Sequence, residues 1–105
     1  MTKAVSTKQE AVQRLQAVRQ ELRRFGVSSL GLFGSFVTRR QTPDSDVDVL
    51  VEFAPGQHSF DNFMELSFFL EDILGRKVDV VTSEALSPHI GPHILREVER
   101  VPLAA

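Results

Sequence analysis

The hydrophobic positions of the chain change their spacing several times, and each spacing predicts one kind of element. Between residues 8 and 25 they recur every three or four residues, which is typical of an amphipathic helix. Ser6 or Thr7 can cap its start and Gly26 can end it. We expect residues 1–7 to be frayed. The apolar positions of the helix are Ala11, Val12, Leu15, Val18, Leu22 and Phe25.

Three short runs rich in valine and leucine predict strands, at residues 29–33, 46–53 and 77–82. The middle run alternates between apolar and polar residues. Because side chains of a strand point to opposite faces in turn, this run has an apolar face and a polar face. The apolar face holds Val47, Val49 and Val51, and the other face holds Asp46, Asp48, Leu50 and Glu52.

The intervening segments predict further helices. We expect a brief one at 35–40, a turn at 42–45, a long helix at 59–74, a turn of helix at 87–88 and a last helix at 92–100. The long helix carries a broad apolar face, which indicates that it packs on the sheet. That face consists of Phe60, Phe63, Met64, Leu66, Phe69, Leu70, Ile73 and Leu74.

The order αβαβαβα predicts one domain over residues 1–105, of the α/β (α+β) class, with helices packed on a small mixed sheet of about three to four strands. If Ser35 ends the first strand and Asp46 begins the second, those two strands must be antiparallel for their ends to meet. A helical crossover makes the third strand parallel to the second. This arrangement brings Asp79 beside Asp46 and Asp48.

Composition narrows the class of protein. The chain has 105 residues with 42% hydrophobic and 25% charged, which is ordinary for a globular domain. Its formal charge of −2 argues against a protein whose main work is to bind nucleic acid. The absence of cysteine excludes disulfides and thiolate catalysis. No apolar run is long enough for a membrane span or a signal peptide, so we expect a cytoplasmic protein.

The candidate chemistry lies in Gly34-Ser35 and in the aspartates that follow. Asp46 and Asp48 share a strand face, where two carboxylates repel each other unless they share a cation such as Mg²⁺. Exposed strand-edge aspartates are the plain alternative, but the valine-rich surroundings favour a metal. A small-residue turn before a helix is a backbone that receives phosphates, although the glycine can also serve close packing and the serine a helix cap.

These residues form the pattern G-S-x10-D-x-D with a later aspartate, which resembles the nucleotidyltransferase superfamily related to DNA polymerase β. The segments LFGS, PDSDVDVLVEF and LGRKVDVVTSEAL-P are similar to its minimal nucleotidyltransferase (MNT) branch. The similarity runs from about residue 30 to residue 101, and it implies the nucleotidyltransferase fold.

The resemblance also implies roles for individual residues. Asp46 and Asp48 would ligate Mg²⁺, and Asp79 would bind a second Mg²⁺ or act as the base for the attacking hydroxyl. Gly34 and Ser35 would hold the β- and γ-phosphates of ATP. The reaction would transfer AMP to a hydroxyl and release pyrophosphate, with two metal ions beside the bound nucleotide.

One position departs from the branch. An arginine usually stands three residues after the serine, followed by glycine, whereas this chain has Thr38 followed by Arg39 and Arg40. If the phosphates need a guanidinium, Arg39 must supply it from a neighbouring position on the short helix.

The resemblance implies a partner as well. MNT proteins of this kind resemble the antitoxins of type VII-like toxin–antitoxin modules, which are paired with HEPN toxins and add AMP to a toxin tyrosine. The alternative is a catalytically weak or inactive protein that neutralises its toxin by binding alone. Transfer to a small molecule or to RNA is a third interpretation. Phe68 lies off the apolar stripe, leaving surface for the partner or a second copy.

Overall fold

A mixed four-stranded sheet in the order β3-β2-β1-β4 organises the computed structural model, which describes residues 3–86, 88–89 and 91–103. β1 is antiparallel to both β2 and β4, and β3 is parallel to β2. The predicted mixed sheet is therefore confirmed, including the direction of each predicted strand. The strands are β1 (Val27–Phe33), β2 (Val47–Phe53), β3 (Val78–Thr82) and β4 (Glu99–Arg100).

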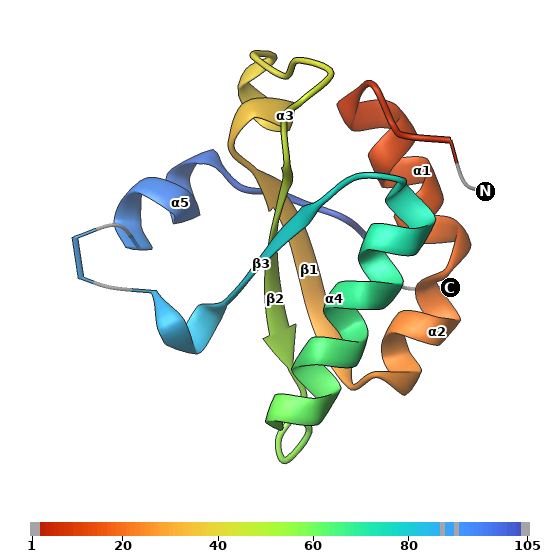
Figure 1. The fold of residues 1–105 in the computed structure, drawn as a ribbon. Helices are drawn as coiled ribbons and strands as arrows, with labels where there is room; N and C mark the ends of the chain where they lie inside the picture. Colours follow the sequence, from red (N-terminus) through yellow and green to blue (C-terminus); the bar gives the residue numbers. More distant parts are fainter. Residues whose placement is uncertain (1–2, 87, 90, 104–105) are drawn as a thin grey trace.

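Helices lie on both sides of this sheet. Figure 1 shows α1, α2 and α4 on one face and α5 on the other, with α3 above the end of β1. None of the helices in the described ranges is long and apolar enough to cross a membrane. The helices are α1 (Lys8–Ala17), α2 (Arg19–Arg24), α3 (Ser35–Thr38), α4 (Phe60–Leu74), the 3₁₀-helix η1 (Ser83–Ala85) and α5 (Gly91–Glu97).

The hydrophobic core lies between the sheet and the first group of helices. Val47, Val49 and Val51 are fully buried there, which confirms the predicted apolar face of β2. Complete burial of one such side chain contributes about 1.5–3 kcal/mol. The other face of β2 turns toward α5, because Leu50 lines a small hollow of about 70 Å³ together with Leu95. Asp48 shares that second face, so the fold directs its carboxylate away from the core.

The first predicted helix is wrong in one respect, since two helices replace it. The helix is interrupted at Val18, whose backbone (φ −111°, ψ 23°) is not helical. The Val18 N–H donates to the Leu15 carbonyl at 3.2 Å, which tightens the turn. Thr7 caps α1 by accepting the Glu10 N–H, as predicted for this position. The expected fraying does not hold at Val5, which is buried and donates its N–H to the Leu74 carbonyl at 2.9 Å.

The C-terminal prediction is also corrected. The last helix ends at Glu97 instead of residue 100, and the next residues form β4, which pairs with Gly31 and Leu32. Gly31 permits this approach, because a Cβ at that position would lie 2.5 Å from Cγ2 of Val98. The predicted turn of helix at 87–88 includes Ser87, which lies outside the described residues, and η1 forms a few residues earlier.

The long helix α4 forms as predicted, with one exception on its apolar face. Ser59 caps it by accepting the Asn62 N–H, and Gly75 ends it in the left-handed conformation. Phe60 is the exception, because it is 77% exposed at the first turn. Phe68 is exposed, in keeping with its place off the stripe.

Candidate active site

Asp48 and Asp79 are register partners on the parallel strands β2 and β3. Side chains at paired positions of neighbouring strands point to the same face of a sheet, so the two carboxylates lie side by side. Asp48 is half-buried, whereas Asp46 and Asp79 are exposed. The predicted meeting of Asp48 and Asp79 is confirmed, and it occurs at a rim that solvent reaches.

Asp46 precedes β2 by one residue instead of belonging to it, and its neighbours hold it in place. The Val47 N–H donates to the Lys77 carbonyl at 3.0 Å, and the Ser45 carbonyl accepts from Nη1 of Arg76 at 2.9 Å. The predicted turn before Asp46 is present, closed by a 3.0 Å bond from the Ser45 N–H to the Thr42 carbonyl. The residues that directly precede β3, Arg76 and Lys77, therefore hold the backbone on both sides of Asp46.

The negative charges of the neighbouring carboxylates oppose ionisation of Asp48. Its partial burial is the largest cause, and together with the charges of Asp79, Asp46 and Glu97, in that order of importance, it raises the pKa of Asp48 to about 6. A carboxylate that resists ionisation for these reasons is stabilised as an anion when a cation lies among its neighbours. The electrostatics of this rim therefore favour a bound cation.

Gly34 lies directly against Asp48. Phe33, the last residue of β1, pairs with Asp48 across the antiparallel ladder, and Gly34 follows with φ 75° and ψ −150°. Gly34 also occupies the N-cap position of α3, so the plain interpretation of Ser35 as the helix cap is wrong. The β1–α3 turn thus brings the Gly-Ser pair to the carboxylates, as the spacing of the pattern predicts.

Glu97 belongs to the same cluster, although no sequence pattern predicts it. The Gly34 N–H donates to Oε2 of Glu97 at 3.3 Å, and Glu97 is among the charges that raise the pKa of Asp48. No spacing or motif relates residue 97 to residue 34. The link depends on β4, which returns the end of α5 to the end of β1.

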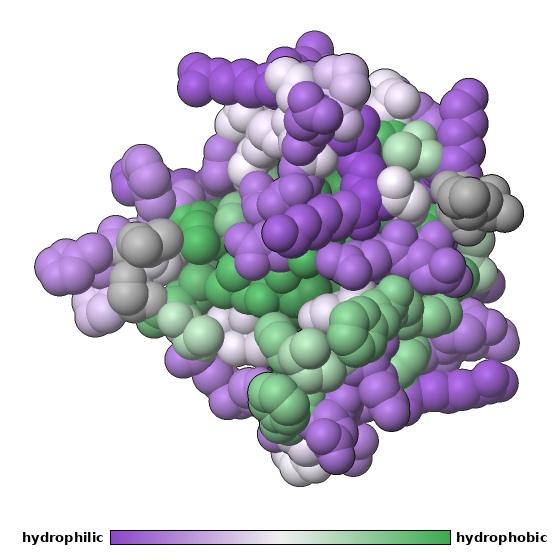
Figure 2. All heavy atoms as spheres, viewed as in Figure 1, coloured by the Kyte–Doolittle hydropathy of each residue, from purple (hydrophilic) through white to green (hydrophobic). Residues whose placement is uncertain are grey.

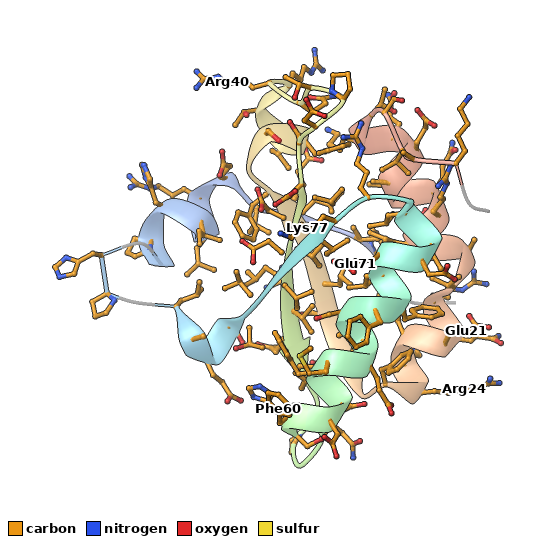
Figure 3. All side chains as sticks on the ribbon, in the orientation of Figure 1. Glu21, Arg24, Arg40, Phe60, Glu71 and Lys77 are labelled. Atoms are coloured by element: carbon orange, nitrogen blue, oxygen red, sulfur yellow. The ribbon has the colours of Figure 1, made fainter. Side chains whose placement is uncertain are left out.

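The structure places Arg39 and Arg40 outside the carboxylate cluster. Arg39 ends α3 with a left-handed φ of 62°, and it lines a hollow of about 370 Å³ against the start of α1. Arg40 points away from the fold (Figure 3). Thr38 donates its hydroxyl to the Gly34 carbonyl at 3.2 Å. A phosphate contact by Arg39 stays a prediction and requires another side-chain conformation.

Magnesium suits the donor set at this rim. Among the described residues, no three histidine or carboxylate side chains are gathered closely enough to hold a metal unaided. Mg²⁺ seldom needs such a cage, because it commonly binds one or two carboxylates and completes its shell with substrate phosphates and water. The oxygen donors of Asp48 with Asp46 and Asp79 fit that kind of site.

A separate apolar hollow of about 480 Å³ lies between the start of α4 and β3. It belongs to the band of apolar surface that crosses the middle of Figure 2. Its described lining residues include no carboxylate, so it is distinct from the aspartate cluster. It is lined by His58, Ser59, Phe60, Phe63, Val80, Val81, Thr82 and Ala85.

Comparison with known proteins identifies similar chains. The sequence profile of the nucleotidyltransferase domain family matches residues 15–101. The protein adenylyltransferase MntA of Thermococcus cleftensis is 44% identical over 96 residues, which are 90% of this chain and 96% of that protein. The solved structure of a candidate minimal nucleotidyltransferase has a TM-score of 0.79 at 30% identity, covering 92% of this chain and 98% of that one.

A further similar structure is a complex from Shewanella oneidensis, between a tri-AMPylated HEPN toxin and an MNT antitoxin. Its matching chain has a TM-score of 0.64 at 19% identity, covering 88% of this chain and 71% of that one. At this identity the likeness concerns the fold. It agrees with the mixed sheet and the helices that cover it.

Proposed function

This chain belongs to the nucleotidyltransferase domain family and is a nucleotidyltransferase, and from that premise we propose that it transfers AMP from ATP to a hydroxyl of a partner protein. The proposed acceptor is a tyrosine of a HEPN toxin, and the second product is pyrophosphate. The chain would then be the antitoxin of a type VII-like toxin–antitoxin module. The likeness to an adenylyltransferase and to an MNT antitoxin supports the proposal.

One observation carries the proposal most directly. Asp48 and Asp79 face the same side of the sheet in register, and Gly34 lies against Asp48. This arrangement supports the proposal, because carboxylates suited to a cation lie beside backbone N–H groups suited to phosphates. A nucleoside triphosphate with its magnesium needs both kinds of group within a few ångström of each other.

The residues divide the work of an in-line displacement. The backbone N–H groups of Gly34 and Ser35 would donate to the β- and γ-phosphate oxygens. Asp46, Asp48 and Asp79 would hold Mg²⁺, which, when bound, neutralises negative charge on the attacking and leaving oxygens. Because each of these groups belongs to a strand or to a turn fixed by a strand, the triphosphate would be held in one orientation.

The acceptor hydroxyl would approach from the open side of the rim. Its oxygen forms a bond to the α-phosphorus, its proton passes to the Asp79 carboxylate, and the bond to the oxygen bridging the α- and β-phosphates breaks. Asp79 suits this step because it is exposed and lies beside the half-buried Asp48. The exposed rim admits a tyrosine presented by another protein.

Label transfer tests this function. The protein is incubated with radiolabelled ATP, Mg²⁺ and the HEPN toxin proposed as its partner, and label on the toxin is followed. Asp46→Asn should abolish labelling, because it removes a cation ligand without changing the side-chain volume. Asp44→Asn is the matched control, since Asp44 lies two residues earlier in the exposed turn.

Two outcomes would argue against the proposal. Labelling that survives in Asp46→Asn would contradict the role of that carboxylate. Neutralisation of the toxin by a variant that has lost all labelling would favour the alternative, in which the chain silences its partner by binding alone.

A further inference from the structure

Glu97 occupies a backbone donor that the proposed function assigns to a phosphate. Its Oε2 accepts the Gly34 N–H at 3.3 Å. A triphosphate that reaches this N–H must displace the Glu97 carboxylate from it. Since carboxylate and phosphate oxygens are both anionic acceptors, they compete for the same donor and repel each other there.

The fold keeps Glu97 next to Gly34. Val98 donates its N–H to the Ile94 carbonyl at 2.8 Å, and the Val101 N–H donates to the Leu30 carbonyl at 2.8 Å. Between them β4 pairs with β1. The backbone of residue 97 is thus anchored on both sides, so its carboxylate can move away from Gly34 only by rotation of the side chain and stays near the site.

Glu97 also adds charge to the carboxylate cluster. It lies close enough to Asp48 for its charge to contribute to the raised pKa of that carboxyl group. With Asp46, Asp48 and Asp79, four acidic side chains therefore lie near the place where the triphosphate would bind. Among the described residues, Glu97 is the one of these four that accepts the Gly34 N–H, so its negative charge lies at the donor proposed for a phosphate.

We propose that Glu97 determines which form of the nucleotide binds, by rejecting the metal-free triphosphate and admitting the magnesium-bound one. The inference rests on the proposed function. Metal-free ATP brings its full negative charge to a donor already held by a carboxylate, and like charges at this distance oppose each other strongly. Mg²⁺ removes much of that charge and attracts the carboxylates at the same time.

Nucleotide binding in the presence and absence of the metal tests the inference without requiring catalysis. The affinity for ATP is measured by calorimetry in EDTA and again in Mg²⁺, for the wild type and for Glu97→Gln. The amide oxygen of glutamine still accepts the Gly34 N–H, so only the charge is lost. Metal-free ATP should bind about tenfold more tightly to the variant, and magnesium-bound ATP should change by less than about threefold.

Glu99→Gln is the matched control. Glu99 lies two residues further along, in β4, and pairs with Lys8 at 2.9 Å, outside the cluster. This variant has the same change of net charge but should leave the affinity for metal-free ATP at the wild-type value. Glu97→Ala should follow Glu97→Gln, and thermal unfolding of each variant establishes that the fold persists.

The outcomes separate the inference from the function on which it rests. If the wild type binds magnesium-bound ATP but Glu97→Gln leaves metal-free binding unchanged, the inference is overturned alone. Loss of magnesium-bound ATP in Glu97→Gln would also overturn it, since Glu97 would then be a ligand of the complex. A wild type that binds no ATP even with Mg²⁺ would overturn both.

Discussion

The Cβ of any other amino acid at position 34 would lie 2.0 Å from Oδ2 of Asp48. The two residues come from consecutive segments of the sheet, because Phe33 at the end of β1 pairs with Asp48 in β2. This contact gives the glycine of the G-S-x10-D-x-D pattern a physical reason. The space that a side chain would fill is needed by the carboxylate.

Gly34→Ala should therefore remove both stability and label transfer. The methyl group collides with the Asp48 carboxylate and is strained by the positive φ of 75°. We expect a loss of about 2–4 kcal/mol in the free energy of unfolding, from strain and overpacking together. Urea denaturation measures it, and label transfer should fall to background.

Gly56→Ala provides the comparison for that experiment. Gly56 has a similar φ of 79°, but its Cβ would meet nothing within 4 Å. It should cost only the backbone strain, about 1 kcal/mol, and leave label transfer intact. Equal effects of the two substitutions would show that the contact with Asp48 is unimportant.

Asp48→Asn should stabilise the folded protein near neutral pH. The folded-state pKa of Asp48 is about 6, above the ordinary value of 3.8. Between these values the folded state binds more protons than the unfolded state, so the stability of the wild type falls as pH rises from about 4 to about 6. The variant lacks this loss and should exceed the wild type by about 1–2 kcal/mol above that window.

Urea denaturation on both sides of the window checks this expectation. Below about pH 4 the carboxyl group is protonated in both states, so the difference between Asp48→Asn and the wild type should vanish. Asp44→Asn, in the exposed turn, is the control for the loss of one carboxylate. A variant that is less stable than the wild type at every pH would contradict the assigned electrostatics.

Arg39 and Arg40 allow a test of whether another arginine takes the place of the one that the family usually has three residues after the serine. If Arg39 turns from the hollow beside α1 to the triphosphate, Arg39→Ala should raise the KM for ATP about tenfold, the effect of one charged hydrogen bond. Arg40→Ala should leave KM unchanged, since Arg40 points away from the fold. Equal KM values for the two variants would show that Arg39 does not contact the phosphates.

The sequence was sufficient to predict the meeting of Asp48 and Asp79, because it depends on regular features. Alternation gives the face of each strand, and the helical crossover gives the parallel direction. Gly34 follows from the end of the first apolar run. Each of these signals extends over several residues, and the packing of the core confirms the face that each strand buries.

Glu97 could not be predicted, because it depends on a strand too short to have a pattern. β4 has two residues, and their charged side chains continue the helical composition that precedes them. The decisive feature is Gly31, whose missing side chain admits Val98. The break at Val18 is similar, since the amphipathic stripe continues through it from α1 to α2.

Arg76 is a further case in which contacts exceed what the sequence indicates. At the entrance of β3 its position predicts ordinary surface charge, yet its guanidinium lies 5.1 Å from the centre of the Phe36 ring in α3. It thereby joins α3 to the turn before Asp46 and to the N-terminal segment. It donates to the carbonyls of Val5, Thr42 (2.9 Å), Pro43 (3.1 Å) and Ser45 (2.9 Å).

Arg76→Ala should loosen Asp46 and lower both stability and catalysis. The carbonyls of Thr42 and Ser45 lose a shared charged donor, so we expect a loss of about 2–3 kcal/mol in unfolding free energy. A displaced Asp46 should lower kcat about tenfold or more and change KM for ATP less.

Arg76→Lys should recover only part of kcat, because an ammonium lacks the planar set of donors. Lys77→Ala is the control, since Lys77 accepts the Val47 N–H with its backbone carbonyl, which the substitution keeps. A kcat at the wild-type level in Arg76→Ala, measured where the variant is folded, would show that the aspartate needs no such support.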